Sequence, residues 1–288
     1  MTAVSASSGS LQRRFATRPA LAVLLGLALA ACGGGGGGDG GSLPSDNGTP
    51  AAKGTRQFTS TGTSRITGSA YALSLYLPPA SAGPRSTLPI VYLLDGESWF
   101  ETLAGIVESR NAAVIVVGVH SAGVRSRDFV PSNNCTSGGG GHAAYFDFVR
   151  QELMPYVEGT FGGNPSQRAL FGHSHGGAFV LYAMFAEAPG RHSFKAYLAS
   201  DSSVSCMSAT ANVWQQNYAA TYLDLPVRLH LSYATQGNYA ANLEYAGALA
   251  QYRYPGFGLV SKAYVGSHGG IVPQVLGDAV EFAFAGSR

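Results

Sequence analysis

Hydrophobic positions beyond residue 57 form two kinds of pattern, and the first is typical of buried strands. The runs 88–94 and 113–119 are continuous, apolar and rich in β-branched residues. Such runs are typical of strands buried on both faces of a parallel sheet. Alternating or shorter apolar runs predict further strands at 63–76, 168–171, 196–200, 227–233 and 259–265.

The second pattern, with a period close to 3.6 residues, is that of amphipathic helices. It predicts helices at 146–157, 178–185, 240–252 and 271–284. Strands that alternate with helices in this way predict an α/β fold, with a mostly parallel central sheet and helices on both faces. We find no internal repeat and no second core, so residues 57–288 are predicted to form one domain.

The amino terminus has the pattern of an export signal. Arg13, Arg14 and Arg18 precede an apolar run at 20–31, which is shorter than the about 20 residues that span a membrane. Residues 1–31 are therefore predicted to be a signal peptide. The Gly-, Ser- and Pro-rich stretch up to residue 56 has the composition of a flexible tether.

The end of this signal, Leu29-Ala30-Ala31-Cys32, resembles a bacterial lipoprotein signal. The resemblance implies cleavage before Cys32 and lipidation of Cys32, so that the tether would join the lipid to the folded domain. We then expect an exported bacterial lipoprotein, anchored in the membrane, with its folded domain in the periplasm or at the cell surface. The alternative is an ordinary signal peptide followed by an unrelated cysteine.

The charge of the chain does not indicate a nucleic-acid partner. The chain has 18 Lys and Arg against 16 Asp and Glu, and three of the arginines lie in the predicted signal, so no basic patch indicates nucleic acid.

Besides Cys32, the chain has two cysteines, Cys135 and Cys206, which lack the spacing of metal ligands. In an oxidising compartment we expect a disulfide between them. It would close a loop of about 70 residues and stabilise the folded state by roughly 4 kcal/mol. Two buried free thiols are the alternative.

The motif that indicates chemistry is Gly172-His173-Ser174-His175-Gly176-Gly177. It matches G-x-S-x-G, the nucleophile elbow, and it lies between a predicted strand and a predicted helix. Such a turn holds Ser174 in a strained conformation and aims the free N–H groups of the helix at the reacting oxygen. The sequence therefore predicts Ser174 as a nucleophile and the N–H of His175 as one oxyanion donor.

A serine nucleophile needs an adjacent base, and in this fold the base comes last in chain order. Of seven histidines, His268 follows the last predicted strand and has small neighbours. We predict His268 as the general base. His192 and His230 are expected to be structural, whereas His120 and His142 are expected near the pocket.

The acid partner of His268 is open. The loop after the next-to-last strand, residues 234–238, holds no carboxylate. Glu244 in the following helix is favoured over Asp201, which ends the strand 196–200. A third option is that Gln236 or Asn238 orients the imidazole through an amide oxygen.

The second oxyanion donor is expected from the loop that follows the strand at 88–94. This loop contains Asp95, Gly96 and Glu97, and a backbone N–H of Gly96 or Glu97 fits the requirement. Asp95 would then hold the loop in place.

Several motifs in one order resemble the putative esterase family. They are Tyr92-Leu93-Leu94-Asp95-Gly96, Val116-Val117-Gly118-Val119, Arg127-Asp128-Phe129-Val130-Pro131, Glu152-Leu153-Met154-Pro155-Tyr156 and the serine motif. The family includes siderophore esterases, S-formylglutathione hydrolases and mycolyl transferases, and the siderophore esterase branch is the most similar. The resemblance implies an α/β-hydrolase fold, a Ser–acid–His triad mapped to Ser174 and His268, and a substrate-lining role for Arg127. The chain departs from the family at Asp201, where proline is usual.

Together these residues predict a serine esterase that acts on a small-molecule ester through an acyl-enzyme. Neither a metal nor an organic cofactor is implied. Two rival functions remain: an acyltransferase on the same fold, and a binding lipoprotein that kept the fold without catalysis. Oligomeric state is not indicated.

Overall fold

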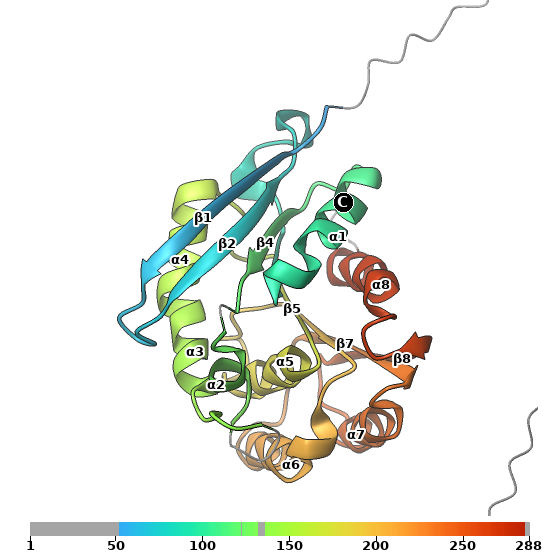
Figure 1. Cartoon of the computed structure of the whole chain (residues 1–288). Helices are drawn as coiled ribbons and strands as arrows, with labels where there is room; N and C mark the ends of the chain where they lie inside the picture. Colours follow the sequence, from blue (N-terminus) through green and yellow to red (C-terminus); the bar gives the residue numbers. More distant parts are fainter. Residues whose placement is uncertain (1–51, 122, 132–135, 286–288) are drawn as a thin grey trace, which may run out of the picture. The chain divides into compact units, whose positions relative to one another are not determined.

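The computed structural model describes residues 52–121, 123–131 and 136–285. In this part of the chain eight strands form one sheet, in the order β1-β2-β4-β3-β5-β6-β7-β8 (Figure 1). Pairs β1–β2 and β2–β4 are antiparallel, and the others are parallel. The strands are β1 (Thr55–Thr63), β2 (Ala70–Leu77), β3 (Ile90–Leu94), β4 (Ile115–Val119), β5 (Arg168–His173), β6 (Ala196–Ser200), β7 (Arg228–Gln236) and β8 (Gly258–Ser267).

Helices cover both faces of this sheet. On one face α1 and α8 pack side by side, and the remaining longer helices build the larger core on the other (Figure 1). The helices are α1 (Gly96–Ser109), α2 (Arg125–Phe129), α3 (His142–Phe148), α4 (Met154–Phe161), α5 (His175–Phe185), α6 (Val204–Thr221), α7 (Tyr239–Gln251) and α8 (Val272–Phe284). The predicted α/β class is confirmed.

The continuous apolar runs are the central strands, as predicted. Every residue of β3 and β4 is buried, because α1 covers one face and the larger core the other. The prediction of one long strand at 63–76 is wrong. Residues 64–69 form a turn between β1 and β2, closed by hydrogen bonds between Ser64 and both Gly68 and Ser69. Since β1 begins at Thr55, the folded part also starts two residues before the predicted boundary at 57.

Parallel strands bring residues distant in sequence to one edge of the sheet. His173 at the end of β5 pairs with Ser200 of β6, and Ser200 pairs with Ser232 of β7. Backbone bonds continue this alignment by one residue: Ser174 N donates to Ser200 O, and Asp201 N donates to Ser232 O. Residues directly after β5 and β6 therefore lie together, at the edge where ligands bind in open α/β sheets.

The buried His230 of β7 makes stability depend on pH. It is 2% exposed, packs against Phe282, and burial lowers the pKa of its imidazole from 6.5 to about 4. As pH falls from 6.5 to 4, His230 binds a proton in the unfolded chain but not in the folded protein. The free energy of unfolding therefore falls by about 3 kcal/mol. We expect His230→Leu to remove this part of the acid sensitivity, measured by urea unfolding at several pH values. An unchanged pH dependence in the variant would contradict the assignment.

Candidate active site

The predicted elbow has the expected backbone strain. Ser174 joins β5 to α5 at φ 59° and ψ −117°, a region that non-glycine residues rarely adopt. Three backbone hydrogen bonds hold it there: Ser174 N donates to Ser200 O at 2.9 Å, and Ser174 O accepts from Ala178 N at 3.1 Å and from Ser203 N at 3.0 Å. The hydroxyl is thus fixed at the carboxyl edge of the sheet.

Close packing around the elbow requires glycine at two of its three positions. A Cβ on Gly172 would lie 2.2 Å from Gly176 O, and one on Gly177 would lie 2.5 Å from Ser202 Oγ. At Gly176 the nearest atom would be Asp95 Oδ2, at an ordinary 3.4 Å. Of the two glycines that lie two residues on either side of Ser174, only Gly172 is crowded, and Gly177 is the second crowded position.

This crowding gives a prediction that uses a matched pair. Gly172→Ala forces a Cβ against backbone and is expected to destabilise the fold by about 3 kcal/mol or more. Gly176→Ala, four residues away on the same turn, is expected to change stability by less than about 1 kcal/mol. Thermal unfolding of the two variants compares them, and equal melting temperatures would contradict the packing argument.

His268 lies after β8 and is hydrogen-bonded to a carboxylate. Its Nδ1 is 2.5 Å from Asp201 Oδ2, and its side chain is 42% exposed whereas Asp201 is fully buried. The sequence-based preference for Glu244 is therefore corrected. Glu244 is exposed on α7, and the residue that contacts the imidazole is the rival, Asp201.

The loop 234–238 explains this correction, because it surrounds the acid instead of supplying it. Asp201 Oδ1 accepts hydrogen bonds from Ala234 N at 2.9 Å and Asn238 N at 3.1 Å. Gly237 leaves room for the carboxylate, since a Cβ there would lie 2.2 Å from Oδ2. The amide of Asn238 bonds Asp201 O and not the imidazole, so the third option for the acid is not supported either.

The electrostatics keep Asp201 ionised. Burial alone would raise its pKa, but the hydrogen bonds from His268 and from the two backbone N–H groups outweigh burial and lower the pKa below its ordinary value. A buried carboxylate that stays charged orients the imidazole with Nδ1–H toward Asp201, leaving Nε2 as the free nitrogen.

The residue directly before Ser174 contacts the ring of His268. The ring of His173, the residue before Ser174, packs 4.4 Å from that of His268, centroid to centroid. Ser174 Oγ is hydrogen-bonded to Ser203 Oγ at 3.2 Å. Across the described residues no hydrogen bond joins Ser174 Oγ to His268; such bonds are often long before substrate binds.

Two helix starts face the elbow. Helix α5 begins at His175, so its first N–H groups have no partner within the helix. The predicted oxyanion loop after β3 is itself the start of α1: Asp95 adopts the left-handed conformation and the helix begins at Gly96. Ser98 N and Trp99 N both donate to Asp95 O, and the N–H groups of Gly96 and Glu97 precede them.

A salt bridge joins these two helix starts. The guanidinium of Arg125 donates to both carboxylate oxygens of Asp95, at 2.7 and 2.9 Å, and also to His173 O at 3.1 Å. Asp95 thus holds its loop, as predicted. Arg125 was not predicted from the sequence, although its position two residues before the Arg127-Asp128 motif could have indicated it.

Arg127 itself does not take the predicted position in the site. Its guanidinium is bound to Asp128 and to Tyr71 and Ser69 of the first hairpin, which commits it to holding α2 against β2. The expected substrate-lining role is therefore not supported. His192 and His230 are structural as predicted: His192 Nε2 bonds Met184 O, and both rings are buried.

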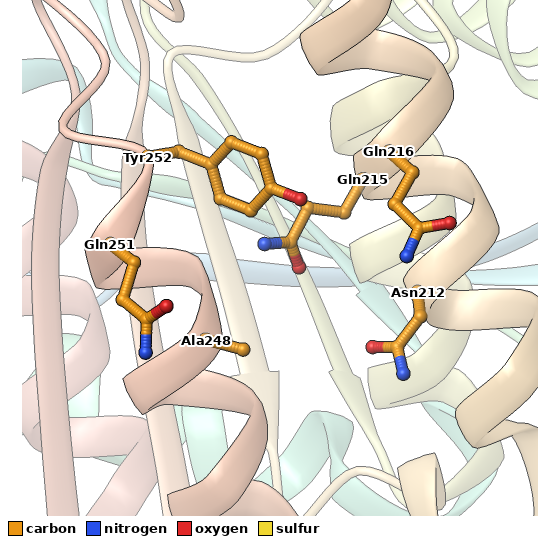
Figure 2. Close-up of a pocket in the computed structure, with 6 residues that line it drawn as sticks. All are labelled: Asn212, Gln215, Gln216, Ala248, Gln251 and Tyr252. Atoms are coloured by element: carbon orange, nitrogen blue, oxygen red, sulfur yellow. The ribbon is translucent and has the colours of Figure 1, made fainter.

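A separate groove lies between α6 and α7. Figure 2 shows the carboxamide side chains and the tyrosine that line it. Its volume is about 380 Å³. It is lined by Asn212, Gln215, Gln216, Ala248, Gln251 and Tyr252. None of the residues of the elbow lines it, and it offers neither a histidine nor a carboxylate, so the groove does not belong to the site.

The described residues also bear on metal ligands, membrane spans and the cysteines. In the described residues no group of side chains has the arrangement of a metal site. Within the same residues, no helix has the length and apolar character needed to cross a membrane. Cys206 lies in α6, whereas Cys32, Cys135, the predicted signal at 1–31 and most of the tether lie outside the described residues.

A nucleophile elbow and a paired histidine and aspartate at the carboxyl edge of a mostly parallel sheet define the α/β-hydrolase class. Comparison with known families agrees. The model of the family described as "Putative esterase" matches residues 64–249, and the chain belongs to this family.

Two of the curated relatives that the chain matches are named as esterases. The siderophore triacetylfusarinine C esterase of Aspergillus fumigatus is 32% identical over 136 residues, which cover 42% of this chain and 46% of the relative. The ferri-bacillibactin esterase BesA of Bacillus subtilis is 26% identical over 151 residues, 44% of this chain and 51% of BesA. The chain thus matches about half the length of these curated relatives.

Solved structures show the same fold over more of the chain. An IroE-like serine hydrolase from Shewanella oneidensis has a TM-score of 0.70 and 25% identity, with 79% of each chain covered. Siderophore hydrolase EstA from Aspergillus nidulans has a TM-score of 0.66 and 19% identity, and covers 80% of this chain and 95% of its own.

Proposed function

We propose that this protein is a serine ester hydrolase with Ser174 as nucleophile, His268 as general base and Asp201 as the acid. The observation that carries this proposal is the 2.5 Å hydrogen bond from His268 to a fully buried Asp201, at the edge where Ser174 is held in a strained turn. A base oriented by an acid beside an activated hydroxyl is the arrangement that acyl transfer requires.

The reaction has two steps. Ser174 Oγ attacks the ester carbonyl while His268 Nε2 takes the hydroxyl proton, and the N–H groups of His175 and of Gly96 or Glu97 stabilise the oxyanion. The carbon–oxygen bond to the alcohol breaks, and His268 gives its proton to the leaving alcohol. Water then attacks the acyl-enzyme with His268 again as base, which releases the acid and restores Ser174.

The substrate class follows from the relatives. One curated relative described above is named as a siderophore esterase and the other as a ferri-bacillibactin esterase, so ester-linked siderophores are the substrates we propose. The proposed location is outside the cytoplasm, through the export signal at 1–31 and a lipid on Cys32, with a disulfide joining Cys135 to Cys206. The sequence patterns support this location and this disulfide.

A hydrolysis panel tests the function. Purified protein is offered ferric and iron-free catecholate siderophores, feruloyl esters and simple acyl esters, with product analysis in water and with added alcohols. Faster release from siderophores than from simple esters is the expected result. Acyl transfer to the alcohol would instead indicate a transferase. If no ester is cleaved and a fluorophosphonate probe does not label Ser174, the protein is a binding lipoprotein and the proposal fails.

A further inference from the structure

Among the described residues His268 makes one side-chain hydrogen bond, and its side chain is 42% exposed, so its orientation needs a second constraint. The bond from Nδ1 to Asp201 fixes one ring atom and still allows the ring to turn about the hydrogen-bond axis. The chain around it gives little help, because Gly266, Gly269 and Gly270 are close in sequence and carry no side chains. Packing against a face of the ring is the remaining way to fix where Nε2 points.

The ring of His173 provides such a face. Its centroid lies 4.4 Å from that of His268, with 40° between the ring planes. His173 is the last residue of β5, directly before Ser174, so a rigid His173 relates the position of the base to that of the nucleophile.

Contacts on several sides hold His173 itself. Its Nδ1 is 3.2 Å from Ser200 Oγ, the ring of Trp99 packs edge-on at 5.8 Å, and its carbonyl accepts a hydrogen bond from Arg125. Only 5% of the residue is exposed. Because these contacts fix the ring of His173, it can restrict the orientation of the ring of His268.

We propose that His173 is a positioning residue that fixes the ring of His268 for proton transfer with Ser174. This inference rests on the proposed function, since it assigns a role through the general base. His173 does not itself touch substrate.

The charge state of His173 is compatible with this role. Burial, then the nearby His268 and Arg125, lower its pKa from 6.5 to about 4, against the opposite effect of Asp201. His173 therefore stays neutral at neutral pH. When His268 takes the serine proton, the ring beside it carries no charge and does not repel the imidazolium.

Substitutions that keep or remove the ring test the proposal, with p-nitrophenyl acetate as substrate. His173→Leu removes the flat face and is expected to lower kcat by roughly 10- to 100-fold with little change in KM, because small displacements of a reacting group have effects of this size. His173→Phe keeps a ring and is expected to stay closer to the wild-type kcat. His230→Leu is the matched control: it removes another buried histidine, whose ring packs against Phe282, and should leave kcat unchanged.

A double-mutant comparison separates positioning from general destabilisation. If His173 acts through His268, then His173→Leu in the background of His268→Ala should change the residual rate by less than about twofold. A wild-type kcat in His173→Leu, or an equal loss in both backgrounds, would overturn the proposal. If instead the wild-type protein shows no turnover, or Ser174→Ala leaves the rate intact, the proposed function has failed and not the positioning role alone.

Discussion

Replacing Ser174 with alanine is expected to lower kcat for ester hydrolysis by about 10⁶-fold, by analogy with measured serine triads. The substitution removes the oxygen that forms the acyl-enzyme, while the oxyanion donors at the starts of α1 and α5 remain. KM should change little. Steady-state kinetics on p-nitrophenyl acetate and labelling by a fluorophosphonate measure the loss.

The neighbouring serine is the matched control for Ser174. Ser203 Oγ lies 3.2 Å from Ser174 Oγ, so Ser203→Ala removes one hydrogen bond at the same place. One such bond is worth about 1 kcal/mol, and the rate should fall by no more than about tenfold. If Ser203→Ala loses labelling and Ser174→Ala retains it, the nucleophile has been assigned to the wrong residue.

Replacing Asp201 with asparagine is the second large effect, with an expected fall in kcat of about 10⁴-fold. Asparagine has nearly the same shape, but its amide favours the wrong tautomer of His268 and cannot stabilise the imidazolium. The pH dependence of stability should also change. Because the pKa of Asp201 is lower in the folded protein than in the unfolded chain, the ionised carboxylate stabilises the fold at pH values above about 3.9. This stabilisation is lost as the pH falls from that value through the lower pKa of the folded protein.

The candidate favoured by sequence alone serves as the control for Asp201. Glu244 is exposed on α7, and Glu244→Gln is expected to keep the wild-type kcat within experimental error. Kinetics of the two variants, with circular dichroism to check folding, decide between them. A large loss in Glu244→Gln together with an active Asp201→Asn would reverse the assignment of the acid.

The local chemistry of the elbow was predictable because one short segment contains it. The spacing of glycines around Ser174 and the strand and helix on either side are all within about 20 residues of sequence. His268 was also predictable, since chain order and small neighbours indicate it. Asp201 was not, because its selection depends on backbone N–H groups of Ala234 and Asn238 from another strand, and the sequence does not show which carboxylate they surround.

Elements with weak amphipathic patterns were missed for a different reason. β1 is an edge strand of mostly polar, exposed residues, and α6 buries small or polar side chains such as Ala211 and Gln215 among its few apolar ones. Tertiary packing, and not the local sequence pattern, determines the secondary structure of β1 and α6. In α1 the spacing of Phe100, Leu103 and Val107 was a valid helical signal, and it was masked by the expectation of a loop after β3.

The loop residues around Asp201, which are Ala234, Gly237 and Asn238, differ in how much sequence variation they should tolerate among homologues. Every residue except proline has a backbone N–H, so substitutions other than proline at positions 234 and 238 keep the hydrogen bonds that hold Asp201 ionised. Gly237 is the reverse case, since any larger residue would push into the space that Oδ2 occupies. A homologue that has lost its carboxylate function should therefore reveal itself first by a bulky residue at position 237, even while its aspartate and histidine are still present.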